Sequence, residues 1–201
     1  MTIEQQPSHA PSNVRPCFST QAAVQLAQTA YGLTATAQEL PSERDQNFYL
    51  SDATGQAFVL KISGTAEQKA VLDFQNKAMT QLAEFGAGLP CPRVCATVNG
   101  ETINSVIGRD GAVHFVRLLT YLPGKPLALV KPHAPELLQS LGAYLGKMDK
   151  ALATFDHPAA HRVLHWDLKQ ASLVIRQHKA KIANPARRAI IEQLLHDFER
   201  A

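Results

Sequence analysis

The 201-residue sequence predicts an α+β fold of two lobes, in which an antiparallel sheet with one inserted helix is followed by helices. Two observations support this prediction. After a first helix, apolar residues alternate in short runs up to residue 119, which is typical of half-buried strands. Beyond a Pro-Gly turn at 123–124 the apolar spacing changes to three and four residues, which is typical of helices.

The first helix is expected to begin after Ser19, a good capping residue, and to end at Gly32. Residues 1–17 are rich in proline and polar residues and are expected to form a flexible tail. Strands are expected next, separated by a polar loop and a tight turn. They cover residues 34–40, 48–50 and 57–62.

The inserted helix is expected over residues 66–85, followed by two short strands around 93–98 and 103–106 and a strong strand over 113–119. Pro135 suits the first turn of a long helix, and Asn184-Pro185 begins a last one. The long helix carries an apolar stripe: Leu138, Leu141, Leu145, Met148 and Leu152. The expected organisation is therefore a sheet lobe over 18–119, a linker at 120–124 and helices over 125–201.

Composition narrows the class of protein. The chain is 45% hydrophobic and 18% charged, as ordinary globular proteins are. No apolar run approaches the ~20 residues that cross a bilayer, and the first residues lack the features of a secretory signal, so we expect a cytoplasmic protein. A net charge of +3 is too mild to indicate nucleic-acid binding. The histidines and the three cysteines show no metal-ligand spacing, so no metal site is expected from this chain's residues.

Lys61 is the first candidate functional residue. It lies inside an apolar strand and faces opposite to Leu60 and Ile62, so it needs either water or a partner. A lysine in this position could contact the phosphates of ATP if an acid on the following helix directed it, and Asp73 and Glu67 are the candidate acids. The alternative is a lysine at an ordinary strand edge.

Two loops could complete a nucleotide site. The linker lies between the predicted lobes, where ligands often bind, and the backbone of Thr120, Tyr121 and Leu122 could contact an adenine edge. The alternative is a plain strand-to-helix turn. The loop at 41–47 could cover phosphates with Ser42 and backbone amides, although it lacks the glycine-rich pattern G-x-G-x-x-G.

Several stretches together resemble the N-terminal half of hydroxylysine-kinase-like members of the aminoglycoside-phosphotransferase family. They are LPSERDQNF, VLKIS, LDFQN, VRLLTYLPGKPLA, LGAYLGKMDKALATFDHP and HWDLKQ. The likeness spans about residues 18–201, and its most specific parts are RLLTYLPG and DQNF. The resemblance implies a kinase-like N-terminal lobe followed by the helical start of a C-terminal lobe.

The resemblance also implies a function: an ATP- and Mg²⁺-dependent kinase acting on a hydroxyl of a small amine or amino acid such as hydroxylysine. By position, Lys61 would hold the phosphates, Asp73 would be its helix acid, and residues 120–122 would contact adenine. Similar domains also occur fused ahead of a class III aminotransferase, so this chain is a candidate part of a longer protein. Neither a nucleic acid nor a membrane is an expected partner.

One stretch resembles a catalytic loop. In HWDLKQAS, residues 165–172, Asp167 would be the base of an H-R-D-L-x-x-x-N motif, and D-F-E at 197–199 would replace D-F-G. We favour a structural role, in which Asp167 pairs locally or caps the next helix. Ser172 is a poorer magnesium ligand than asparagine, D-F-E lies in an amphipathic stretch, and the family's H-G-D-x-x-x-x-N loop follows later than a W-D-L-K stretch.

We therefore expect a chain that stops before its catalytic loop, contains no catalytic residue and is inactive alone. Two alternatives stay open. One is a binding or regulatory module that keeps the kinase-like fold without catalysis. The other is a complete small kinase that uses Asp167.

Overall fold

The structure is a computed structural model that describes residues 15–86, 88–109, 111–164 and 167–200. It consists of two compact units with a boundary between Ala159 and Ala160. Residues 1–14 of the expected tail lie outside the described residues, and Arg15 pairs with Glu39 at 3.1 Å. No helix in the described part of the chain is long and apolar enough to cross a membrane.

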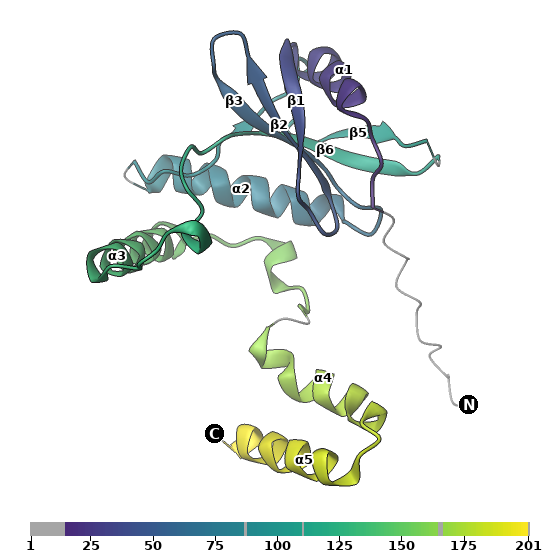
Figure 1. Ribbon diagram of the computed structural model, residues 1–201, viewed down its shortest axis with the longest axis vertical. Coiled ribbons are helices and arrows are strands. Elements are labelled where there is room, and N and C mark those ends of the chain that lie inside the picture. The colour runs from purple at the N-terminus through teal and green to yellow at the C-terminus, as the bar shows by residue number, and fades with distance from the viewer. Residues whose placement is uncertain (1–14, 87, 110, 165–166, 201) are drawn as a thin grey trace. The chain divides into compact units, whose positions relative to one another are not determined.

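The first unit is built on a sheet in which, among the described residues, six strands pair antiparallel (Figure 1). The strands are β1 (Ala35–Leu40), β2 (Gln46–Asp52), β3 (Ala57–Ile62), β4 (Val94–Cys95), β5 (Asn104–Ile107) and β6 (Val113–Thr120). Their order is β1-β2-β3-β6-β4, and β5 also pairs with β6. Among the described strands, the last in sequence, β6, therefore lies inside the sheet, with β3 on one side and the two short strands on the other.

Helix α1 (Thr20–Tyr31) covers one face of this sheet. The Ser19 hydroxyl accepts a hydrogen bond from the backbone N–H of Ala22 at 3.1 Å, and Gly32 ends the helix with φ of 64°. Both caps confirm the sequence prediction, since a left-handed C-terminal residue favours glycine. The core forms between α1 and alternate residues of the strands: Ala23, Ala27, Phe48, Leu50, Phe58, Leu60, Ile62, Val116 and Leu118.

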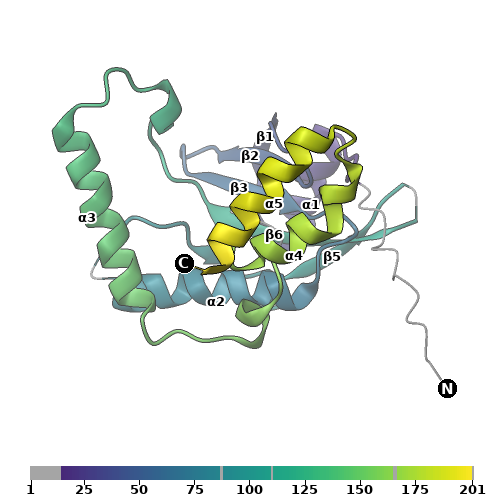
Figure 2. The ribbon, with the colours of Figure 1, turned by 90° about the horizontal axis from the view of Figure 1, so that it is seen from below.

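Helix α2 (Lys69–Phe85) lies along the opposite face of the sheet, as Figure 2 shows. It begins three residues later than position 66, the start expected from the sequence, because the backbone N–H of Glu67 donates to the carbonyl of Gly64 and forms a turn there. Alternation on β6 explains the arrangement. Val116 and Leu118 point into the core with α1, and Arg117 between them bonds to α2.

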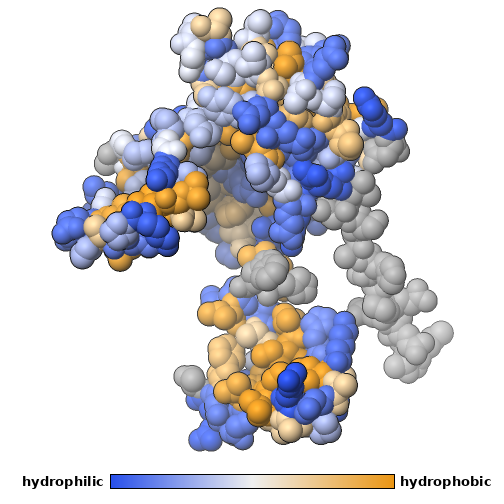
Figure 3. Space-filling view, viewed as in Figure 1, coloured by the Kyte–Doolittle hydropathy of each residue, from blue (hydrophilic) through white to orange (hydrophobic). Residues whose placement is uncertain are grey.

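Helix α3 (Pro135–Leu152) packs against the C-terminal half of α2 through Met148 and Leu152, which contact a cluster containing Leu82 and Cys91. The predicted apolar stripe is therefore only partly covered. Leu138 and Leu145 are 50% and 49% exposed, and Figure 3 shows apolar residues running along α3 at the surface.

The second unit holds α4 (Ala171–His178) and α5 (Pro185–Arg200). An ion pair between Arg176 and Glu199 at 2.7 Å joins these two helices, and a second, between Lys179 and Glu192 at 2.9 Å, joins the 3₁₀ turn after α4 to α5. As predicted, the last helix starts at Pro185. Short 3₁₀ turns lie in this unit at η3 (Leu168–Gln170) and η4 (Lys179–Lys181). Others precede them in the chain, at η1 (Leu127–Leu129) and η2 (Pro158–His161).

Candidate functional site

Lys61 lies on the face of β3 that points away from α1. Phe58, Leu60 and Ile62 are buried in the core, so the alternation of the strand places Lys61 with Val59 on the other face, as the sequence predicted. Its side chain is 26% exposed. A partly buried ammonium in this position requires acceptors.

Two groups from the neighbouring strand and loop supply those acceptors. The Lys61 Nζ donates to Asn47 Oδ1 at 3.0 Å and lies 3.7 Å from Asp45 Oδ2. Asn47 is the direct cross-strand neighbour of Lys61 in the β2–β3 ladder. Asp45 ends the loop that joins β1 to β2. Both partners therefore come from the β2 side of the lysine.

A second cation lies beside Lys61. Arg117 is its cross-strand neighbour on β6, so two positive side chains share this face of the sheet. Burial lowers the pKa of Lys61 and the charge of Arg117 lowers it further, whereas the carboxylate of Asp45 raises it. Burial and Arg117 therefore disfavour the charged form of Lys61, and the carboxylate of Asp45 stabilises it.

Arg117 fastens α2 to the sheet. The residue is 3% exposed, and its guanidinium donates to Asn76 Oδ1 at 2.8 Å, to Gln75 Oε1 at 2.7 Å and to the carbonyl of Leu72 at 3.3 Å. Burial lowers the pKa of Arg117, and Asp45 and Glu67 oppose that effect. Sequence reasoning missed this residue, although a basic residue inside the apolar run VHFVRLL was a visible signal.

Asp73 does not reach Lys61 in the structure. Its Oδ2 lies 2.8 Å from Lys77 Nζ and 3.1 Å from His157 Nε2, in the segment after α3. The hydrogen bond from Lys77, followed by that from His157, lowers the pKa of Asp73. Helix geometry explains the separation, because Asp73 is turned roughly 100° about the helix axis from Leu72, whose carbonyl accepts a hydrogen bond from Arg117.

Glu67, the other candidate acid, lies in the turn before α2. Its Oε1 accepts a hydrogen bond from the backbone N–H of Gln68 at 3.2 Å. Among the described residues, Asp45 is thus the carboxylate found within ion-pair distance of Lys61.

The first two residues of the linker still form hydrogen bonds with the sheet. The N–H of Thr120 donates to the carbonyl of Arg93 at 2.9 Å, and the N–H of Tyr121 donates to the carbonyl of Ala57 at 2.9 Å. The ring of Tyr121 meets that of Tyr49 edge to face, with centroids 5.0 Å apart. Leu122 follows at the surface.

Ser42 lies in the loop between β1 and β2, the same loop that ends at Asp45. The structure thus places the loop, Lys61 and the start of the linker on three parts of one sheet. β2 follows the loop, β3 carries the lysine, and β6 runs into the linker.

Asp167 has a local structural role. Its carboxylate accepts a hydrogen bond from the backbone N–H of Lys169 at 3.0 Å and caps η3, which confirms the capping interpretation. Asp197 lies inside α5 and accepts a hydrogen bond from Gln193 Nε2, so D-F-E is helical. His165 and Trp166 lie outside the described residues.

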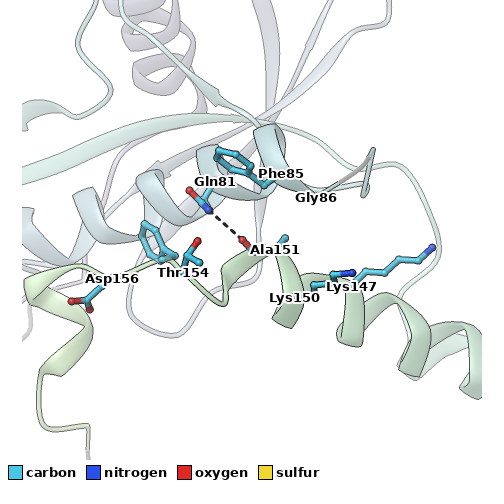
Figure 4. Close-up of a pocket in the computed structure, with 9 residues that line it drawn as sticks. Gln81, Phe85, Gly86, Lys147, Lys150, Ala151, Thr154 and Asp156 are labelled. Atoms are coloured by element: carbon cyan, nitrogen blue, oxygen red, sulfur yellow. Dashed lines mark hydrogen bonds between the residues drawn. The ribbon is translucent and has the colours of Figure 1, made fainter.

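A cavity of about 750 Å³ lies elsewhere in the first unit, between the C-terminal ends of α2 and α3 (Figure 4). Phe85 and Lys147 line it, and Gln81 bridges the two helices by donating to the carbonyl of Ala151 at 3.3 Å. Neither Lys61 nor a linker residue lines this cavity, so it is separate from the candidate site.

A lysine on the third strand, an inserted helix and a strand that runs into a linker together define the N-terminal lobe of a kinase-like fold. Two solved structures share this fold. One is described as "Amicoumacin kinase hAmiN in complex with AMP-PNP, Ca2+ and Ami", with a TM-score of 0.64, 18% identity, and coverage of 89% of this chain and 54% of that chain. The other is described as "Structure of the microcompartment-associated aminopropanol kinase", with a TM-score of 0.58, 16% identity, and coverage of 76% and 46%.

Residues 36–201 match the sequence model of the Phosphotransferase enzyme family (APH), and the chain belongs to this family. Among curated relatives, hydroxylysine kinase of Bos taurus is 34% identical over 203 residues, covering 92% of this chain and 53% of the relative. Hydroxylysine kinase of Mus musculus is 31% identical over 205 residues, covering 94% and 54%. The chain therefore spans about half the length of the curated relatives it matches.

Proposed function

We propose that this chain is the nucleotide-binding part of an ATP-dependent kinase that phosphorylates a hydroxyl group of a small amine or amino acid, such as hydroxylysine. The observation that carries the proposal is the placement of Lys61. Its ammonium lies on the face of the sheet opposite to α1, with Asn47 and Asp45 as partners. Its strand, β3, lies between β2, which follows the loop that contains Ser42, and β6, which runs into the linker. The relatives named hydroxylysine kinase support this substrate class.

Lys61, Ser42 and the linker residues receive roles in this proposal. The Lys61 ammonium donates to the phosphates, and Ser42 with the amides of its loop adds further donors. In the linker, the N–H groups of Thr120 and Tyr121 are already used within the sheet. The N–H of Leu122 is therefore our choice for the adenine edge, with the Tyr121 ring beside it.

Mg²⁺ would arrive with the phosphates of ATP and neutralise part of their charge. We assign it no ligand among the residues of this chain. We also assign Asp73 no contact with Lys61, because its carboxylate is held by Lys77 and His157.

A non-catalytic nucleotide-binding module is the second candidate function. The cap formed by Asp167, whose Oδ1 accepts from the backbone N–H of Lys169, speaks against a small kinase that uses Asp167, and it is compatible with this module as well as with the kinase part proposed above. Fusion to an aminotransferase stays a prediction, which the neighbouring sequence of the gene would test.

The direct test is calorimetric titration of this chain with ATP and Mg²⁺. Lys61→Ala should weaken binding about 10- to 100-fold, the range expected for one hydrogen bond to a charged group. Lys77→Ala is the matched control, since Lys77 is 59% exposed and pairs with Asp73. Its affinity should stay within about twofold of wild type, in line with the small energies of surface pairs. A folded wild-type chain that binds no nucleotide would contradict the proposal.

The substrate class needs a separate test on the longest protein that the gene encodes. ATP consumption should rise with hydroxylysine and not with lysine, which has the same charges but lacks the hydroxyl group. Stimulation by both amino acids equally, or by neither, would contradict this substrate class. The module hypothesis instead predicts nucleotide binding without consumption.

A further inference from the structure

The counter-charge of Lys61 comes from an unexpected part of the chain. An ammonium that is largely buried beside a second cation needs a carboxylate nearby. Among the described residues, Asp45 supplies it, with its Oδ2 3.7 Å from the Lys61 Nζ. The helix that follows the lysine strand offers Asp73, but that side chain is engaged with Lys77 and His157.

Arg117 explains why the helix does not supply this acid. The groups of α2 that accept from Arg117 are spaced three and four residues apart and so lie on one side of the helix: Leu72, Gln75 and Asn76. They offer a carbonyl and two amides to the guanidinium, and none of them is a carboxylate. The side of α2 that faces β6 therefore binds Arg117, and the carboxylate beside Lys61 comes from the loop before β2.

Asp45 is well placed to hold Lys61 in a fixed direction. The β2–β3 ladder pairs Asn47 with Lys61 and Gln46 with Ile62, so Asp45 lies at the end of this ladder. Its Oδ1 also accepts a hydrogen bond from the backbone N–H of Gly64, two residues beyond β3, at 3.4 Å. The carboxylate of Asp45, which precedes β2, therefore contacts both Lys61 on β3 and the backbone just after β3.

We propose that Asp45, together with Asn47, is the positioning group that aims the Lys61 ammonium at the phosphates, in place of an acid on α2. An ammonium has three donors. Asn47 takes one and Asp45 attracts another, both from the β2 side, which directs the remaining donor away from β2. This inference rests on the proposed function, because it assumes that a phosphate is the group toward which the lysine is aimed.

The arrangement also couples Lys61 to the loop between β1 and β2, which is the candidate phosphate-binding loop. Asp45 is the last residue of the loop that contains Ser42, and its own carbonyl accepts from Arg15 Nε at 3.4 Å. A change in the loop is thereby transmitted to the ammonium through one side chain. An acid on the helix would instead have linked the lysine to movements of α2.

The first experiment needs no nucleotide. The pH dependence of Lys61 acylation by an amine reagent, followed by mass spectrometry, reports the pKa of Lys61 in the folded chain. The charged groups around it are Asp45 from the loop and Arg117 from β6, with Glu67 and Tyr31 acting on Arg117. Asp45→Asn should make Lys61 reactive at lower pH, because removing the carboxylate leaves burial and Arg117 unopposed.

Matched variants of the other acids give the comparison. Glu67→Gln and Asp73→Asn each remove one negative charge with little change of shape, and both should leave the reactivity profile of Lys61 unchanged. Asp45→Glu keeps the charge and should retain the wild-type profile. The inference is overturned if Asp45→Asn leaves the profile unchanged, or if either control variant produces the shift instead.

The second experiment measures ATP·Mg²⁺ affinity of the same variants. Asp45→Asn should weaken binding about fivefold to tenfold near neutral pH, the loss expected when one charged contact is misdirected. The loss should grow as the pH rises, since more of the lysine is then neutral. Glu67→Gln and Asp73→Asn should stay within about twofold of wild type.

The two proposals can fail separately. Binding that depends on Lys61 but not on Asp45 would overturn the positioning role and leave the proposed function standing. If Asp45→Asn shifts the reactivity profile of Lys61 but the folded wild-type chain binds no nucleotide, the proposed function is contradicted. Asp45 would then be a counter-ion and no longer a positioning residue.

Discussion

Replacing Arg117 with alanine should loosen α2 from the sheet and lower the free energy of unfolding of the first unit by about 3–5 kcal/mol. Arg117 is 3% exposed, and its guanidinium donates to three acceptors on α2, at 2.7, 2.8 and 3.3 Å. It is therefore the polar connection between β6 and the helix, and its loss leaves those acceptors without their donor.

The magnitude follows from opposing effects. A hydrogen bond to a charged group contributes about 1.5–3 kcal/mol, but three bonds to one side chain are not additive. Alanine also removes the cost of burying a guanidinium, which offsets several kcal/mol. What remains is about 1–3 kcal/mol for each buried acceptor left unpaired, reduced wherever water enters the space. Breaking a buried charged network in other proteins costs a similar amount, about 3–5 kcal/mol.

The assay is hydrogen–deuterium exchange across a urea series, evaluated for Arg117 variants on peptides from β6 and α2, and for the Arg176 control on peptides from α4 and α5, which belong to the other unit. Arg117→Lys should lose most of the same stability, because a point charge cannot reach three acceptors as a planar fork does. Arg176 is the control, since it also makes three hydrogen bonds, all to Glu199, yet its side chain is 57% exposed. Arg176→Ala should cost less than about 1 kcal/mol. Equal losses for the two alanine variants would refute the reasoning.

Gly32→Ala should destabilise the first unit by about 1–2 kcal/mol, because φ of 64° is unfavourable for a residue with a Cβ. Gly142→Ala, inside α3 with open space around an added Cβ, should instead stabilise by up to about 1 kcal/mol. Thermal unfolding distinguishes the two, and the same sign for both would contradict the role of φ. Hydrogen bonds from Lys77 and His157 lower the pKa of Asp73, so its stabilising effect is present above the ordinary carboxyl pKa and is lost as the pH falls through the lowered value. The difference in stability between wild type and Asp73→Asn should therefore be constant near neutral pH and shrink in acid, and a difference that persists at the lowest pH would be inconsistent with it.

Local signals were sufficient to predict most of the secondary structure. Capping residues placed the first and last helices, because Ser19 and Gly32 act on the backbone beside them and Pro185 pre-sets the first turn. The strand over 57–62 matched β3 at both ends, because its alternating burial leaves a period that the sequence displays. Asp167 was correctly interpreted as a cap for the same local reason.

The partners within the candidate site could not be predicted in this way. Asp73 is four residues from Lys77, a spacing that the sequence does show, but its second partner His157 lies 84 residues away. The pairing of Lys61 with Asp45 depends on the register of β2 against β3, which no local pattern specifies. The orientation of Arg117 toward α2 likewise required the order of strands in the sheet.

The position of β6 has a consequence for how the protein is made. Because β6 follows the other described strands in sequence but lies inside the sheet, β3 has no neighbour on one side until the ribosome has released residues 113–120. During that interval the apolar residues of AFVLKI form an open strand edge, the kind of surface on which nascent chains aggregate. Residues 57–62 would therefore be a target for a chaperone that binds short extended apolar segments while the chain is still being synthesised.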